Sequence, residues 1–144
     1  MTMGMSTQEW EGPFTAKFKL YDATHGNVIQ YRSQLEKAVF QYYVPKSFLI
    51  GLFGPEPPET LVVQVGKTYL PMSEMDFGGK YIPSKTGSDF WEYQYSTRKD
   101  QPSNSWLYEI TDEGQRYSLY VPNEVMEGSL APKRLIVRLG VLEE

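Results

Sequence analysis

Cysteine is absent from this sequence, and histidine occurs only once, as His25. The absence of cysteine excludes disulfides, thiol catalysis, and zinc or iron–sulfur sites built from cysteine. A single histidine cannot supply a His-based zinc site, and the sequence Thr-His-Gly-Asn around His25 is typical of an exposed turn. We therefore expect a protein without a metal, a cofactor or catalytic residues.

Long apolar runs are missing as well. The longest one, residues 48–53, is far shorter than the ~20 residues that a membrane helix requires. The first twelve residues lack the basic start, apolar centre and small-residue cleavage site of a secretory signal. These absences predict a cytoplasmic protein with no membrane contact.

Basic residues are fewer than acidic ones, 14 against 18, so the formal net charge is −4. An acidic domain does not attract the phosphates of nucleic acids over its whole surface. Binding to nucleic acid would therefore require a local basic patch.

Tyrosine is abundant, with 11 Tyr beside 7 Phe and 3 Trp, and apolar residues alternate with polar ones along most of the chain. Both features are typical of β-strands. The predicted strands cover residues 14–21, 28–32, 39–44, 61–65, 90–96, 106–110, 116–121 and 134–142. Short helices are expected only at residues 46–52 and 123–130, because each follows a proline that fits the first helical turn.

Two stretches of the chain, residues 40–66 and 117–140, look like copies of each other. The shared residues are Tyr43, Val44, Pro45 and Gly51, which recur 77 positions later, and Pro58, Leu61, Val63 and Gly66, which recur 74 positions later. One such unit per half-chain suggests two units that bury their apolar faces against each other.

We therefore predict an all-β fold, a small pseudo-symmetric barrel built from two related β-hairpin/short-helix/strand repeats. A flexible N-terminal segment, residues 1–12, precedes a single barrel domain, residues 13–144. Repeat one covers about residues 13–72 and repeat two about residues 88–142.

The two copies also carry a family resemblance. The first runs from Val-Pro-Lys at residues 44–46 through Phe48 and Leu49 to Phe-Gly at residues 53–54, before a Val-rich strand. In the second, a Thr-Asp-Glu-Gly-Gln-Arg turn leads into Val-Pro within residues 111–122. This order resembles the swapped-hairpin barrel of AbrB-type DNA-binding regulators and antitoxins, in which two subunits interlock. The resemblance implies an internal pseudo-dimer and DNA-linked regulation.

If the resemblance extends to function, basic residues near the repeated turns contact DNA phosphates. These residues are Lys37, Arg116, Lys133, Arg134 and Arg138. The hypothesis requires Arg116, Arg134 and Arg138 to share one exposed face. The alternative is that these cations pair with neighbouring carboxylates on solvated strands.

A protein partner or a homo-oligomer is the second hypothesis. Phe48, Leu49 and Phe53 form a concentrated apolar patch, which favours an interaction surface if it is exposed. The adjacent Pro55, Pro57 and Pro58 predict a stiff, extended ridge of the kind that docks into aromatic grooves.

The third hypothesis uses strand aromatics as a platform for single-stranded nucleic acid or carbohydrate. Trp91, Tyr93 and Tyr95 are the candidate platform, although strands use such rings for core packing as well. A second aromatic and basic group comprises Phe18, Tyr21 and Tyr31 with Lys17, Lys19 and Arg32. All three hypotheses describe a non-catalytic binding module.

Overall fold

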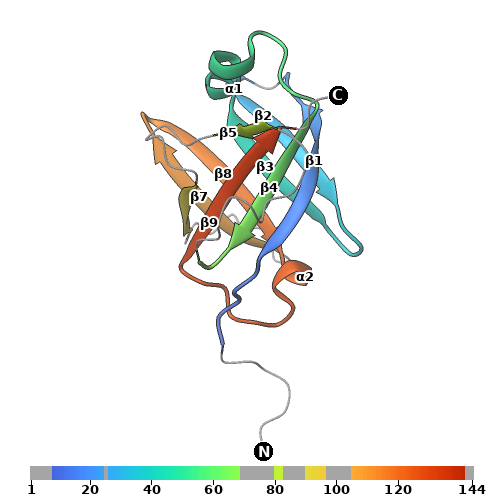
Figure 1. Cartoon of the computed structure of the whole chain (residues 1–144), viewed down its shortest axis with the longest axis vertical. Coiled ribbons are helices and arrows are strands. Elements are labelled where there is room, and N and C mark those ends of the chain that lie inside the picture. The colour runs from blue at the N-terminus through green and yellow to red at the C-terminus, as the bar shows by residue number, and fades with distance from the viewer. Residues whose placement is uncertain (1–7, 25, 69–79, 83–89, 97–104, 142–144) are drawn as a thin grey trace, which may run out of the picture.

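Eight antiparallel strands close into a barrel in the computed structural model of this chain (Figure 1). The structure describes residues 8–24, 26–68, 80–82, 90–96 and 105–141. Strands account for 59% of the structure and helices for 11%, so the prediction of an all-β barrel is confirmed.

The elements lie close to their predicted positions. They are β1 (Phe14–Asp22), β2 (Val28–Gln34), β3 (Val39–Pro45), α1 (Lys46–Phe53), β4 (Thr60–Gly66), β5 (Lys80–Ile82), β6 (Trp91–Tyr95), β7 (Ser105–Asp112), β8 (Gln115–Pro122), α2 (Asn123–Met126) and β9 (Arg134–Val141). Only β5 was not predicted, because three residues are too few to show an alternating pattern.

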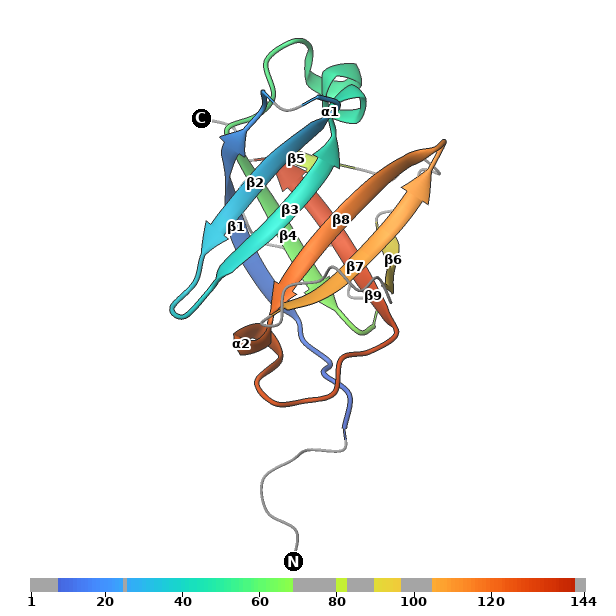
Figure 2. The ribbon, with the colours of Figure 1, turned by 180° about the vertical axis from the view of Figure 1, so that it is seen from behind.

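Around the barrel the order is β4-β1-β2-β3-β8-β7-β6-β9, and pairing between β4 and β9 closes the circle. The short β5 pairs with the end of β9, beyond the segment that pairs with β6. Figure 1 shows β4 and β9 in front, and Figure 2 shows β2, β3, β8 and β7 side by side on the opposite side. The helices α1 and α2 lie at opposite ends of the barrel.

The strands of the two halves pair in the same way. Pairings β1–β2, β2–β3 and β1–β4 in the first half correspond to β6–β7, β7–β8 and β6–β9 in the second. Their registers also correspond, since Leu20 opposite Tyr31 has its counterpart in Tyr95 opposite Tyr108. Whether one rotation superposes the two halves stays a prediction.

The barrel interior is rich in aromatic side chains that alternate with outward-facing residues. Rings that are fully buried there belong to Phe18, Tyr31, Phe40, Tyr42, Tyr93, Tyr108 and Tyr117. Phe18 meets Phe40 edge to face with 4.8 Å between ring centroids, an arrangement that aromatic pairs favour. The hydroxyls of Tyr42 and Tyr93 hydrogen-bond to each other at 2.5 Å, so burial leaves neither of them unsatisfied.

Each helix follows a proline and packs against one end of the barrel. In α1, Ser47 Oγ donates to Gln115 Oε1 of β8 at 2.8 Å. In α2, a carboxylate oxygen of Glu124 accepts from the backbone N–H of Lys37 at 2.9 Å. The second helix is shorter than predicted because Glu127 adopts a left-handed conformation, with φ of 45°, which ends the helix.

Residues 8–12 are attached to the barrel, which differs from the flexible segment expected there. Trp10 is 9% exposed, and its backbone N–H donates to the carbonyl of Leu130 at 2.8 Å. The rest of that segment lies outside the described residues. Among the described helices, none is long and apolar enough to cross a membrane.

Candidate binding face

Arg138 is the clearest departure from the predicted basic surface. It is only 1% exposed, and its Nη1 atom donates to Gln64 Oε1 at 3.5 Å. Because Val137 and Leu139 belong to the core, alternation does place Arg138 on the outer side of β9. That side is buried at this position, so the expectation of a solvated Arg138 is wrong.

The other predicted DNA contacts lie apart from one another. Arg116 is the second residue of β8, and its Nε atom lies 3.6 Å from Glu109 Oε2 of β7. Arg134 begins β9, and its Nη1 atom lies 3.1 Å from Glu92 Oε1 of β6. Lys133 and Arg134 line a hollow of about 240 Å³ together with Glu9 and Lys67. These side chains do not form the shared exposed face that the duplex-DNA hypothesis requires.

Part of the predicted partner surface is buried. Phe48 and Leu49 are 8% and 1% exposed and belong to the core. Phe53 is partly buried, as are two of the three ridge prolines, Pro57 and Pro58, while Pro55 is exposed. The exposed apolar residues of α1 are instead Ile50 and Leu52.

The predicted aromatic platform is also buried. Trp91 is 4% and Tyr93 0% exposed, and Tyr95 is partly buried against Trp106 and Tyr108. These rings occupy the inward positions of β6, so they cannot stack on a ligand from solvent. The expectation of a platform at this place is wrong because burial, not ligand binding, explains the aromatic pattern.

Aromatic, amide and basic side chains instead meet on the outer side of β1, β2, β3 and β8. We call this surface the tyrosine face. One row across it follows the strand register from Lys19 to Arg32, then to Gln41 and Tyr120. The adjacent row is made of Asp22, Gln30, Tyr43 and Ser118.

Tyr43 and Tyr120 touch at the centre of the tyrosine face, with ring centroids 5.6 Å apart and planes inclined by 73°. The Tyr43 hydroxyl donates to Gln41 Oε1 at 3.0 Å, and Gln30 Nε2 donates to the same oxygen at 2.8 Å. Burial, with a contribution from Tyr120, raises the pKa of Tyr43. Its hydroxyl is therefore a neutral hydrogen-bonding group at physiological pH.

Arg32 lies beside these rings and stacks on a third one. Its guanidinium carbon is 3.6 Å from the centroid of the Tyr21 ring, which is 57% exposed. Within the described part of the chain Arg32 forms no ion pair, and its buried Nε atom has no hydrogen-bond partner. A half-buried cation without a carboxylate partner is a suitable contact for an anionic ligand.

The tyrosine face is basic although the chain is acidic. The strand segments β1, β2, β3 and β8 contain one carboxylate, Asp22, and no other acidic residue. Their basic residues are Lys17, Lys19, Arg32 and Arg116. Lys19 leans toward β4, where its Nζ donates to Thr60 Oγ1 at 2.9 Å.

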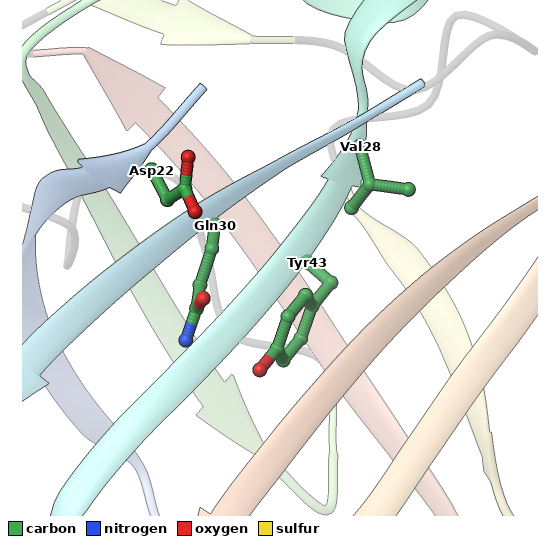
Figure 3. Close-up of a pocket in the computed structure, with 4 residues that line it drawn as sticks. All are labelled: Asp22, Val28, Gln30 and Tyr43. Atoms are coloured by element: carbon green, nitrogen blue, oxygen red, sulfur yellow. The ribbon is translucent and has the colours of Figure 1, made fainter. Parts of the chain in front are cut away.

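Two shallow hollows cover the centre of the face. The first, of about 300 Å³, is lined by Asp22, Val28, Gln30 and Tyr43 (Figure 3). The second, of about 320 Å³, adds Arg116, Ser118 and Tyr120 to Val28 and Tyr43. Because they share Val28 and Tyr43, the two hollows form one continuous depression across β2, β3 and β8.

Sequence reasoning found one side of this face and missed its centre. Tyr21, Lys17, Lys19 and Arg32 belong to the second aromatic and basic group predicted from the sequence. The pair Tyr43 and Tyr120 was missed because β3 and β8 are far apart in sequence and become neighbours only in the barrel. A signal was available, since both tyrosines recur in the repeat at positions that alternate with core residues.

The described residues contain no cluster of three or more His, Asp or Glu side chains that could hold a metal ion. The tyrosine face offers aromatic rings, amides and cations, groups that can stack on a ligand or hydrogen-bond to it. Comparison with known proteins adds no relative, since no protein-family model and no curated protein matches this sequence.

Proposed function

We propose that this protein is a non-catalytic module that binds single-stranded nucleic acid on the tyrosine face. One observation carries the proposal: three cations, Lys17, Lys19 and Arg32, lie with one carboxylate and three outward tyrosines on four adjacent strands of a chain whose net charge is −4. The fourth cation of these strands, Arg116, is paired with Glu109 of β7. Cations and exposed rings on one sheet surface are the combination used by sequence-tolerant single-strand binders.

Each part of the face has a role in this proposal. Tyr43 and Tyr120 provide rings on which unpaired bases stack, and such a contact is worth ~1–3 kcal/mol per base. Arg32 neutralises a phosphate. The amides of Gln30 and Gln41 lie between the rings and the cations, where they can hydrogen-bond to base edges.

Duplex DNA fits the geometry less well. The AbrB-like hypothesis relies on Arg116, Arg134 and Arg138, of which one is buried and the other two pair with carboxylates on different strands. A half-buried ring pair also has no access to bases that remain stacked inside a duplex. Single strands expose those bases and therefore suit the tyrosine face better.

Fluorescence anisotropy tests the proposal directly. Labelled single-stranded DNA, single-stranded RNA and duplex DNA are titrated with the protein at low and at near-physiological salt. We expect single strands to bind more tightly than the duplex, with an affinity that falls as salt rises. No binding to single strands at low salt, or a preference for duplex, would refute the proposal.

Matched variants locate the binding surface. Tyr120→Ala is expected to weaken single-strand binding by roughly 5- to 100-fold, in line with the loss of one stacking contact. Arg134→Ala removes a cation from another part of the barrel and is the control, because Arg134 lies outside the tyrosine face. Equal effects of the two changes would place the ligand elsewhere.

A further inference from the structure

Three basic residues on the strands of the first half correspond to two acidic residues and one neutral residue in the second. Strand β6 pairs with β9 as β1 pairs with β4, so Glu92 corresponds to Lys17 and Gln94 to Lys19. Strand β7 pairs with β8 as β2 pairs with β3, so Glu109 corresponds to Arg32. The basic side chains of the first half are thus replaced by neutral or acidic ones in the second.

This difference in charge places a cation and a carboxylate on opposite sides of the central tyrosines of the tyrosine face. Tyr43 and Tyr120 occupy corresponding positions and lie on the two central strands, β3 and β8. On one side of them lies Arg32, and on the other side Glu109 stands directly opposite Ser118 of β8. Two equivalent rings therefore have a cation on one flank and a carboxylate on the other.

We infer that Glu109 determines where a single strand binds, because it confines the phosphates to the β1–β2 side of the central tyrosines. The inference rests on the proposed function and specifies its geometry. Glu109 acts in two ways: its carboxylate repels phosphates, and it lies 3.6 Å from Arg116 and so neutralises that cation. Each chain consequently binds one strand, although its barrel has two similarly built halves.

A charge change at Glu109 tests the inference. Glu109→Lys is expected to tighten binding of an oligothymidylate by 5-fold or more at low salt and to make the salt dependence steeper. The slope should change by about 0.7 for each additional phosphate that the variant neutralises. Glu109→Gln removes only the carboxylate and should tighten binding to a smaller extent. Glu56→Lys is the control, because it changes the net charge as much as Glu109→Lys does but lies on an exposed loop beyond α1.

The reverse change is made at the corresponding position of the first half. Arg32→Gln is expected to weaken binding by about 3- to 10-fold and to reduce the slope by about 0.7, the contribution of one phosphate. Stoichiometry is measured by titration at protein concentrations well above Kd, with an expected ratio of one short strand per chain. Circular dichroism and urea unfolding verify that each variant is folded.

The outcomes separate this inference from the proposed function. If wild-type protein binds no single strand at low salt, both are wrong. If it binds but Glu109→Lys, Glu109→Gln and Glu56→Lys change affinity equally, Glu109 has no positional role and the inference alone fails. Two strands per wild-type chain would also overturn the inference while leaving single-strand binding intact.

Discussion

Gln64 and Arg138 lie directly opposite each other where β4 and β9 close the barrel, with Arg138 Nη1 donating to Gln64 Oε1 at 3.5 Å. Both side chains are almost completely buried, at 5% and 1% exposure. Gln64 Nε2 in turn donates to Thr15 Oγ1 of β1 at 3.2 Å. A chain of hydrogen-bonded polar side chains thus runs across three neighbouring strands, from Thr15 of β1 through Gln64 of β4 to Arg138 of β9.

Replacing Arg138 should therefore affect stability more than binding. We expect Arg138→Ala to lower the free energy of unfolding by about 2–4 kcal/mol, because it removes a buried side chain and a partner of Gln64. Arg134→Ala should cost less than about 1 kcal/mol, since its ion pair with Glu92 is exposed. Urea unfolding of both variants measures this difference. Equal losses in the free energy of unfolding would show that the burial of Arg138 does not contribute to stability.

Two tyrosine hydroxyls make corresponding hydrogen bonds in the two halves. Tyr31 donates to the carbonyl of Pro58 at 2.7 Å, and Tyr108 donates to that of Pro132 at 2.5 Å. Tyr31→Phe and Tyr108→Phe should each lower the free energy of unfolding by about 1–2 kcal/mol, because each leaves a carbonyl without its donor. Denaturant unfolding provides the measurement. A loss in only one of the variants would argue that the two bonds are not equivalent.

Alkaline pH should destabilise the barrel. Burial raises the pKa of Tyr31, Tyr42, Tyr93 and Tyr108 above the usual 10.0. Above pH 10 the unfolded chain loses these protons while the folded chain retains them, so the free energy of unfolding falls as pH rises. Each such tyrosine contributes about 1.4 kcal/mol per pH unit in this range.

Tyrosinate absorbance and unfolding followed over the same pH range check this prediction. Fewer than the 11 tyrosines should ionise before the protein unfolds. Ionisation of all tyrosines near pH 10 in a protein that remains folded would contradict it.

Gly12 leaves room for the Trp10 ring, which a larger residue at this position would meet. Its φ is +72°, and a Cβ atom there would lie 2.8 Å from the Trp10 ring and 3.0 Å from the carbonyl oxygen of Val65. Gly12→Ala should lower the free energy of unfolding by roughly 2–4 kcal/mol and shift tryptophan fluorescence toward that of exposed indole. Gly114→Ala is the control, because Gly114 has a similar φ of +76° but open space around it. Gly114→Ala should lower the free energy of unfolding by only about 1–2 kcal/mol, the strain of an alanine in the left-handed conformation.

The strands were predictable because side-chain alternation is a local property of the backbone. In β6, for example, exposed Glu92 and Gln94 alternate with buried Trp91 and Tyr93, as a strand with one buried face requires. The same alternation could have shown that these two rings belong to the core. The predicted platform assumed that the aromatic rings of β6 are exposed. The period-two pattern indicates only which residues share a face of the strand, not whether that face is exposed.

Alternation cannot show whether an outward position is exposed. Arg138 lies on the outer side of β9, as its position between Val137 and Leu139 predicts, yet it is buried. Burial of that side depends on which parts of the chain pack there, and the sequence of a single strand contains no information about them.

The sequence by itself determined the eight barrel strands, the helices after Pro45 and Pro122, and the similarity in sequence between residues 40–66 and 117–140. Local side-chain patterns and proline geometry are sufficient for these features. Only the tertiary structure decided that β3 lies beside β8, which brings Tyr43 against Tyr120 and places Arg32 and Glu109 on opposite flanks of this pair. Pairing between distant strands depends on barrel closure and on packing of the shared core, and neither is specified by any one segment.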